Sequence, residues 1–470
     1  MLWKALWMRR AAEAASPSTP PAAEPAPTPA IEPPRPVDSS SMSLESTANA
    51  PAVPAHEPVR ARPWWRPSRR RVLLALAVLF LGVMGYGYTH KSEFSAQAAD
   101  LSRRIIGDEN TARVEAWYFR VQDRIDRTKY RLLGGDTDPF AVEEVVVQFV
   151  KQPPQQVIDI TLEHSYDFGP ELPPPPKPMT PPETIPLRET LEAGEGVWTT
   201  ASLPRTSPDD PVLMRTFIRP DKSRPYALVG VLLMDSRRVM LHMVGGTADP
   251  GGDRGVKGPG VIPQDDRANL IAAWNGGFKG PHGGFGMVAN GKEYRPLRNG
   301  LASIAVMQDG TIKMGEWGND IAWEEGMVAV RQNAVLLVRN GEISRRVTEG
   351  NDTWGYVNVN SAEFITWRSA VGLTRDGNLL YASGNSLSAE TLAKALYAAG
   401  AHTAMQLDIN TPYVLLGTYF PQPDGSVTSQ KFMDTMSDNP ARFLKSQERD
   451  FMYITLDETR YRNTTPATAR

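Results

Sequence analysis

The sequence predicts an α+β fold: a β-rich, mixed and mostly antiparallel sheet domain with flanking helices, preceded by one transmembrane helix. Asn or Asp precedes Gly at positions 290, 309, 340 and 376. Such pairs between alternating apolar runs are typical of hairpin turns, because both central residues of a type I′ turn must accept positive φ. The runs beside them, including SIAVMQ, TIKMG, AVLLVR and LLYASG, have the composition of strands. The domain therefore consists mainly of antiparallel neighbours.

One helix of this domain is marked at both ends. Ser388 is a suitable N-cap for the run AETLAKALYAAG, and Gly400 ends it. Leu392 and Leu396 share one face with the neighbouring alanines. The apolar run TAMQLDI follows at once and is typical of a buried strand that ends in polar residues.

A separate apolar segment precedes the domain. Residues 72–88, VLLALAVLFLGVMGYGY, carry no charge, and at about 1.5 Å per residue they nearly cross a bilayer core of ~30 Å. Six arginines stand between positions 60 and 71, so the positive-inside rule places the N-terminus in the cytoplasm and the C-terminal domain outside the cell membrane, as a single-pass protein. The alternatives are a buried core helix and a signal peptide cleaved near the A-x-A-like site at 96–98.

Composition divides the rest of the chain. Pro, Ala and Ser dominate the first 70 residues, and Pro recurs at 173–186. The predicted order is a disordered cytoplasmic tail (1–70), a transmembrane helix (71–90), a stalk helix with a small strand segment (91–168), a Pro-rich linker (169–189), the main domain (190–460) and a disordered tail (461–470).

The stalk is predicted from an apolar stripe at three- and four-residue steps. Its members are Val114, Trp117, Tyr118, Val121, Ile125 and Leu132. The stripe predicts a stalk or packing helix and also allows a homodimer through that helix. Residues 142–166 form either a small subdomain or the first strands of the main domain.

Composition also excludes several kinds of site. The formal net charge is −2, so a nucleic-acid partner is not expected. The chain has no Cys, which excludes disulfides, thiolate metal sites and a Cys nucleophile. The six His residues do not pair at metal-ligand spacing, so we expect no metal and no cofactor.

Three segments carry the residues most suited to chemistry. The glycine-rich segment 273–286, AWNGGFKGPHGGFG, could leave backbone N–H groups free to bind an anion, or could simply connect a hairpin. Arg368 directly precedes an apolar strand and needs either an anionic ligand or a structural partner. Asp408 ends the apolar strand after the predicted helix, where a catalytic carboxylate or a structural Asp would both be expected.

Together these segments resemble the phosphodiester glycosidase family, over roughly residues 225–455. The family's NGGFF-type turn appears as NGGFK at 275–279, and its R-[ST]-A-[IV]-G strand as RSAVG at 368–372, followed by Asp-Gly at 376–377. Only Leu-Asp of the family's L-D-G-G-G-S strand end is present, at 407–408. The resemblance implies an enzyme that removes a sugar from its anomeric phosphodiester, in a family that includes bacterial envelope proteins linked by name to exopolysaccharide.

The resemblance implies roles for three residues that should line one pocket. Asp408 would be the nucleophile or base, and Arg368 would neutralise the phosphate. If the two residues lie within ~4–6 Å, Arg368 should also lower the pKa of Asp408. Asn275 would fix a sugar hydroxyl or a phosphate oxygen. The further substrate-binding candidates are Gly276, Gly277, Lys279, His282, Asn410, Thr411 and Glu363, the last as a second carboxylate.

The departure from the family pattern follows Asp408 directly. Ile409, Asn410, Thr411 and Pro412 stand where the family has glycines and a serine. These residues reduce the freedom of the backbone to approach a phosphate, and Pro has no N–H. The alternative function is therefore a non-catalytic protein of the same fold that binds a glycan or phosphoglycan or assists polysaccharide assembly. In either case the expected partners are the lipid bilayer and a carbohydrate phosphodiester or envelope glycan.

Overall fold

The computed structural model describes residues 91–134, 139–140, 144–147, 177–355, 364–411, 413–436 and 439–463. These residues belong to one compact unit, Arg69–Arg470. No helix within these ranges combines the length and the apolar character needed to span a bilayer. The predicted N-terminal tail, the predicted span at 72–88, residues 169–176 of the predicted linker, residues 464–470 of the predicted C-terminal tail and Glu363 lie outside the described residues, so those predictions stay predictions.

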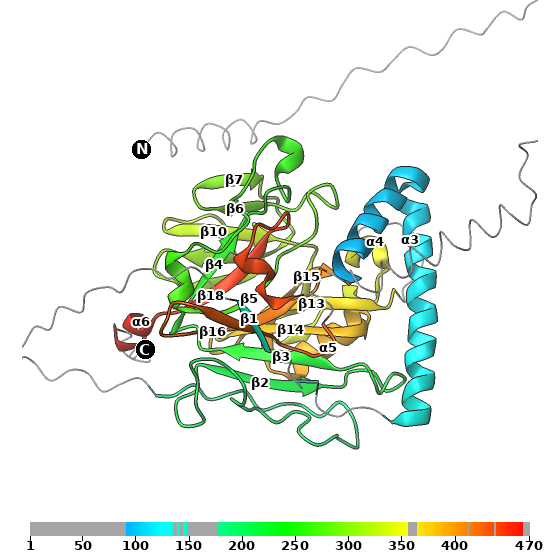
Figure 1. Cartoon of the computed structure of the whole chain (residues 1–470), viewed down its shortest axis with the longest axis horizontal. Coiled ribbons are helices and arrows are strands. Elements are labelled where there is room, and N and C mark those ends of the chain that lie inside the picture. Colours follow the sequence, from blue (N-terminus) through cyan, green and yellow to red (C-terminus); the bar gives the residue numbers. More distant parts are fainter. Residues whose placement is uncertain are drawn as a thin grey trace, which may run out of the picture. The chain divides into compact units, whose positions relative to one another are not determined.

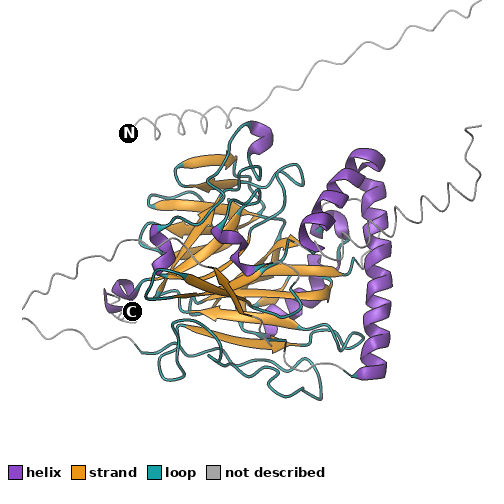
Figure 2. Cartoon of the chain, in the orientation of Figure 1, coloured by secondary structure: helices purple, strands orange, loops and turns teal. Residues whose placement is uncertain are grey.

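Strands dominate the described part of the chain, and three sheets contain them (Figures 1 and 2). The six-stranded sheet has the order β1 (Glu144–Val147), β17 (Val427–Lys431), β16 (Leu416–Pro421), β5 (Leu270–Asn275), β18 (Phe451–Leu456), β4 (Val239–Val244). The seven-stranded sheet has the order β12 (Glu342–Ile343), β11 (Leu336–Arg339), β15 (Ala401–Ile409), β13 (Thr366–Thr374), β14 (Leu379–Leu387), β3 (Val229–Met234), β2 (Leu213–Ile218). The five-stranded sheet has the order β7 (Lys292–Arg295), β6 (Met287–Ala289), β10 (Met327–Gln332), β8 (Ala302–Met307), β9 (Ile312–Glu316).

Every named strand pair in these sheets is antiparallel, which confirms the predicted β-rich, mostly antiparallel architecture. The helices are α3 (Lys91–Leu133), α4 (Asn351–Trp354), α5 (Ala389–Ala398) and α6 (Glu458–Asn463). Four short 3₁₀ helices accompany them, η1 (Gly252–Arg254), η2 (Asp265–Ala268), η3 (Arg345–Thr348) and η4 (Pro440–Leu444).

The four Asn-Gly and Asp-Gly pairs all connect neighbouring antiparallel strands, as predicted. At 290–291 and 340–341 both residues have positive φ, from 51° to 76°, which is the requirement of a type I′ turn. At 309–310 and 376–377 only the glycine has positive φ, near 80°. These two connections are longer turns that need a single left-handed residue, so the sequence predicted the hairpins correctly and the turn type in half of them.

The predicted helix after Ser388 is confirmed as α5. The Ser388 hydroxyl accepts a hydrogen bond from the Thr391 N–H, and the Thr391 hydroxyl accepts one from the Ser388 N–H, which completes a capping box. Leu392 and Leu396 are fully buried. The helix packs against β14, β15 and β11 and thereby covers one face of the seven-stranded sheet.

Two apolar layers hold the sheets together. Between the six- and seven-stranded sheets, Trp274 of β5 and Tyr381 of β14 pack with ring centroids 5.7 Å apart in the larger core. On the opposite face of the seven-stranded sheet, α5 closes a second core that includes Ala370, Leu380 and Ile409. The two faces of this sheet therefore have different neighbours, and this difference decides which side chains meet at the site.

An irregularity in β15 changes the direction of its last side chains. Arg368 pairs with Ile409 and Ala370 pairs with Gln406, so β15 uses one more residue than β13 over this stretch. Such a β-bulge interrupts strict alternation and redirects side chains near it. Leu407 belongs to the core between the sheets, and Ile409 belongs to the core under α5.

The main domain starts earlier than the predicted boundary at residue 190. β1 pairs with β17, so part of the predicted strand segment completes the six-stranded sheet. Met179 is buried in the core beside α5, and the Ile185 N–H donates to the Ala398 carbonyl. The Pro-rich composition predicted a stiff, extended linker, and proline is compatible with an extended chain that packs against a folded surface.

Candidate active site

Asp408 lies at the bulged end of β15, and nearly all of its surface is buried. Its Oδ1 accepts a hydrogen bond from the Ile409 N–H at 2.9 Å, and its Oδ2 pairs with the Arg449 guanidinium. Its backbone N–H donates to the Gly276 carbonyl, and its carbonyl accepts from the Ser369 hydroxyl. The carboxylate is thus held in one orientation beside a cation.

Arg449 lies two residues before the start of β18 and connects several parts of the site. Besides the ion pair with Asp408, its Nη2 donates to the Gly277 carbonyl at 3.0 Å. Its Nε lies 3.6 Å from Oδ2 of Asp249 and has no hydrogen bond, although the atom is buried. One guanidinium therefore bridges two carboxylates and retains an unfilled donor.

Lys279 and Tyr413 complete the cluster. The Lys279 Nζ lies 5.5 Å from the centroid of the Tyr413 ring, and the Arg449 Cζ lies 4.8 Å from it. Two cations thus lie against one ring, in a cluster that also holds the carboxylates of Asp408 and Asp249. The Tyr413 hydroxyl is buried and has no hydrogen-bond partner in the described structure.

The electrostatic state of Asp408 follows from these neighbours. Burial raises the pKa of Asp408 to about 6, because a carboxylate loses solvation there, and the nearby Asp450 acts in the same direction. Arg449, the Ile409 N–H and Lys279 oppose this rise. Burial lowers the pKa of Arg449, but the charges of Asp408 and Asp249 outweigh burial and raise it overall. A carboxyl group with a pKa near 6 can change its protonation state in the neutral range.

Asn275 lies near Asp408, but its side chain is occupied. Its Nδ2 donates to the Gly276 carbonyl and to the Ser369 hydroxyl, which in turn donates to the Asp408 carbonyl. Its Oδ1 accepts from the Tyr381 hydroxyl and from the Leu415 N–H. All four hydrogen-bonding positions of the amide are filled. Asn275 therefore fixes the end of β5 and supports Asp408 instead of being free to bind a sugar hydroxyl.

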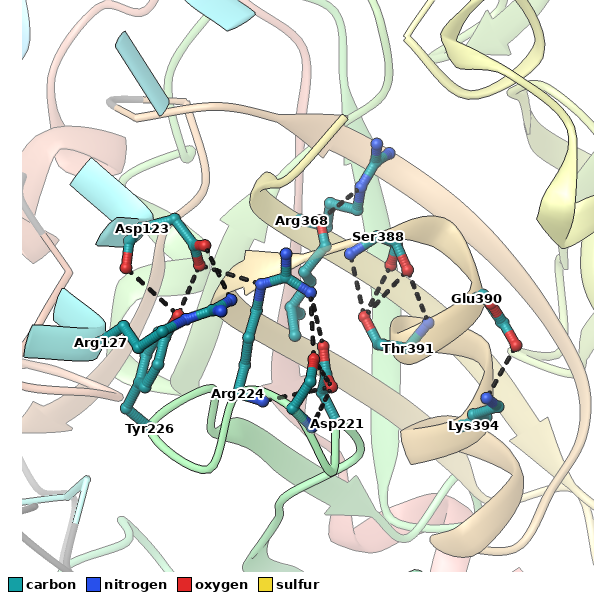
Figure 3. Close-up of polar contacts among 12 residues, drawn as sticks. Asp123, Arg127, Asp221, Arg224, Tyr226, Arg368, Ser388, Glu390, Thr391 and Lys394 are labelled. Carbon is teal, nitrogen blue, oxygen red and sulfur yellow. Dashed lines mark hydrogen bonds and ion pairs between the residues drawn. The ribbon is translucent and has the colours of Figure 1, made fainter. Parts of the chain in front are cut away.

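Arg368 is not where the predicted pocket requires it. Its guanidinium lies near the N-terminus of α5, beside Ser388 (Figure 3). It donates to the carbonyls of Leu387, Trp354 and Phe364 and to Oε1 of Gln406, at 2.7–3.0 Å.

The neighbouring Ser369 points to Asp408, so strand alternation places Arg368 on the other face of the sheet. Burial lowers the pKa of Arg368 to about 9. The expectation that Arg368 lowers the pKa of Asp408 is therefore wrong, and Arg449 is the cation that contacts this carboxylate.

The glycine-rich turn also differs from the expected anion-binding loop. The N–H groups of Gly276 and Gly277 donate to the carbonyl and to Oδ2 of Asp450, so they are not free. Asp450 forms a two-point ion pair with Arg331, at 2.7 and 3.1 Å, and both side chains are almost completely buried. A Cβ at Gly276 would lie 2.0 Å from Asp450 Oδ2, and one at Gly277 would lie 2.8 Å from Arg331. The glycines make room for this ion pair.

The remaining predicted substrate-binding residues do not all lie at the cluster around Asp408. Lys279 is in the cluster, while the His282 N–H donates to the Lys279 carbonyl within the turn. Asn410 has a φ of 72°, where the family pattern has glycine, and its Oδ1 accepts from the Thr366 hydroxyl. The Ile409 side chain is buried in the core under α5, so it does not obstruct Asp408. The structure gives Thr411 a half-buried position and no side-chain contact that assigns it a role.

Sequence reasoning missed Arg449, Asp450 and Asp249. A signal was available for the first two, because Arg449-Asp450 directly precedes the apolar run FMYITL, which is the same pattern that singled out Arg368. Asp249 lies in a Gly-rich stretch without an adjacent apolar strand, and nothing in the sequence distinguishes it from other loop acids.

A cavity of about 450 Å³ lies elsewhere in the described structure. Residues of α3, of the loop after β2 and of the segment after β17 line it, among them Tyr130, Tyr226 and Asp434. None of the lining residues belongs to the cluster around Asp408. We therefore place the candidate site by its chemistry, at Asp408.

Comparison with known proteins connects the segment that carries Lys279 and Asp408 to a family. Residues 268–408 match the model of the phosphodiester glycosidase family, which confirms the resemblance read from the motifs. The chain is also similar to the solved catalytic domain of zebrafish N-acetylglucosamine-1-phosphodiester alpha-N-acetylglucosaminidase, auto-inhibited by its pro-peptide, at 18% identity and a TM-score of 0.36, over 55% of this chain and 87% of that one. A protein from Synechocystis is similar at 13% identity and a TM-score of 0.28, over 52% of this chain and 62% of that one. The search of curated proteins finds no match.

Proposed function

We propose that this chain, because residues 268–408 match the model of the phosphodiester glycosidase family, hydrolyses the bond between a sugar and an anomeric phosphodiester. We further propose that it acts in envelope or exopolysaccharide metabolism, on the extracytoplasmic side of a membrane that residues 72–88 span. The family match supports the glycosidase chemistry, and the arginines before residue 72 support the location.

One observation carries the proposal: the buried carboxylate of Asp408 is paired with Arg449, near Lys279 and next to polar atoms that lack hydrogen bonds. Arg449 and Lys279 provide the positive charge that a phosphate group requires. The Nε of Arg449 and the hydroxyl of Tyr413 lack partners, and a bound phosphate or sugar oxygen would satisfy both.

The chemistry then follows from the arrangement. Cleavage of the bond between C1 of the sugar and the bridging oxygen produces positive charge at C1, which the Asp408 carboxylate stabilises or attacks. The electrons of the broken bond stay on the phosphate oxygen, where Arg449 and Lys279 offset the added charge. Water supplies the hydroxyl group that C1 finally carries, and its proton goes to a base.

Asp249 is the candidate for that base. Its carboxylate lies against the same guanidinium as Asp408, and its Oδ1 accepts a hydrogen bond from the Gly280 N–H at 3.0 Å. A glycosidase generally needs two carboxyl groups, and Asp249 takes the place that the sequence alone suggested for Glu363.

Asp408→Asn tests the proposal in cells that produce the full chain. Intact cells should release sugar from a sugar-1-phosphodiester that does not cross membranes, and the variant should lower the rate by roughly 10³-fold. Because the amide is nearly the same size, the fold should persist, which circular dichroism can check. Activity seen only after lysis would contradict the proposed location.

The same assay separates the enzyme from the alternative of a non-catalytic binder. A wild-type chain that binds a panel of such diesters without releasing sugar would refute catalysis and support glycan or phosphoglycan binding. A chain that neither binds nor cleaves them would refute both.

A further inference from the structure

The helix α3 presents an apolar stripe to solvent in place of packing it against the domain. Trp117 and Ile125 are each 60% exposed, and Leu132 is 78% exposed. The remaining members of the stripe are Val114, Tyr118 and Val121. At 1.5 Å per residue the stripe is ~27 Å long, so it is a continuous surface and not a single exposed side chain.

Contacts with the domain fix which face of α3 points outward. Asp123 accepts hydrogen bonds from Arg224 at 3.0 Å and from the Tyr226 hydroxyl at 2.6 Å (Figure 3). Phe119 packs edge-on against Phe364, and Tyr130 packs against Tyr226. These residues lie opposite the apolar stripe on the helix, so the docked face and the exposed face are both defined.

A row of arginines runs beside the stripe. Arg113, Arg120, Arg124 and Arg131 are exposed and each directly precedes a member of the stripe, so the two rows are parallel and adjacent. Lys129 is exposed on the other flank. Where the structure describes α3 side chains, the acidic ones at 115, 123 and 126 are all half-buried, so the exposed charges are basic only.

We propose that this face of α3 lies on an anionic phospholipid surface. Aromatic and aliphatic side chains with flanking Arg and Lys are the composition of helices that lie in the interface of a bilayer. The position in the chain agrees with this, because α3 begins at Lys91, close to the predicted span at 72–88, and the part of α3 after its break at Gly107 carries the stripe. The helix would thus hold the domain in a set orientation on the membrane and not act as a free stalk.

The charges disfavour the homodimer that the stripe allows. In a parallel coiled coil that buries Tyr118, Val121 and Ile125, Arg124 of one copy faces Lys129 of the other. Two like charges at these flanking positions repel, whereas anionic lipid head groups attract both.

The chain has no Cys, so a single introduced Cys can carry a label in the full-length protein. Ile125→Cys places an environment-sensitive fluorophore on the stripe, and Val328→Cys, on β10 across the molecule from α3, is the matched exposed control (Figure 1). Both proteins are reconstituted into phosphatidylcholine vesicles with or without phosphatidylglycerol and with brominated acyl chains. We expect quenching at residue 125 in the anionic vesicles, weaker quenching without anionic lipid, and none at residue 328.

Removing basic charge should weaken the contact in steps. Arg120→Gln and Arg124→Gln should each lower the lipid-bound to free ratio of the helix about fivefold, the equivalent of ~1 kcal/mol. A label at residue 125 that stays in water in both vesicle types would overturn the proposal. Pyrene excimers between two labelled copies, without lipid quenching, would also overturn it and would establish the homodimer.

Discussion

The region around Arg368 and the region around Arg449 hold two largely buried arginines with opposite surroundings. Arg368, on the α5 side of the seven-stranded sheet, uses four of its five N–H groups on three carbonyls and a glutamine, and burial lowers its pKa to about 9. Arg449 touches two carboxylates and an aromatic ring and keeps an unfilled Nε. The N–H groups of Arg368 donate almost entirely to protein acceptors, whereas Arg449 keeps an Nε–H that a ligand could accept.

The same substitution at both arginines should give opposite results. Arg368→Lys should lower the free energy of unfolding by about 4 kcal/mol, because three buried carbonyls lose donors, while activity per folded molecule persists. Arg449→Lys should lower the rate roughly 100-fold with a smaller loss of stability, about 1–2 kcal/mol, because Lys keeps the charge but leaves the Gly277 carbonyl without its donor. Urea unfolding and sugar release measure the two effects. If the Arg368→Lys variant folds but loses activity, Arg368 takes part in the reaction after all.

The pH dependence of stability sharpens the contrast at Asp408. Its pKa rises from 3.8 to about 6 on folding, so its contribution to stability is complete below pH 4 and is lost as the pH rises through 6. Asp408→Asn should therefore become more stable relative to wild type over this interval, by ~3 kcal/mol at most. Activity should rise with pH over the same interval, because the ionised carboxylate is the reactive form. If the free energy of unfolding of the two proteins changes with pH in the same way, burial does not raise the pKa of Asp408.

The smallest expected effect concerns the unpartnered hydroxyl of Tyr413. Tyr413→Phe should leave stability unchanged or raise it by less than ~1 kcal/mol, because a buried group without a hydrogen bond is removed. Activity should fall about tenfold if the hydroxyl contacts a substrate oxygen. Kinetics at saturating and at low diester concentration would separate an effect on KM from one on kcat. A stability loss above 1 kcal/mol would indicate a structural partner instead.

Local patterns were sufficient for much of the fold. The Asn-Gly and Asp-Gly pairs predicted the positions of the hairpins, and Ser388 with the periodic run after it predicted α5. Both predictions succeeded because turns and helix caps depend on residues that are close in sequence. The apolar stripe from Val114 to Leu132 correctly predicted a helix, which is part of α3. It did not reveal that the stripe faces solvent, because periodicity identifies a face without identifying what covers it.

The site was only partly predictable for a different reason. Asp408 and Lys279 were identified from strand ends and glycine context, and both are in the cluster. The β-bulge before Ile409 places Arg368 and Asp408 in different surroundings, and a one-residue irregularity leaves no mark in composition. Arg449 and Asp249 reach Asp408 from positions 41 and 159 residues away along the chain, a proximity that depends on the whole sheet arrangement.

The buried pair between Arg331 and Asp450 restricts how this sequence can change. A methyl group at Gly276 or at Gly277 would collide with one partner of the pair, so neither glycine can be replaced while both charges remain. Loss of one charge first would leave the other buried without a partner, at a cost of about 3–5 kcal/mol. The four positions are therefore accessible to mutation only as a group. A lineage that retained this turn for packing alone would still display the motif after losing all activity.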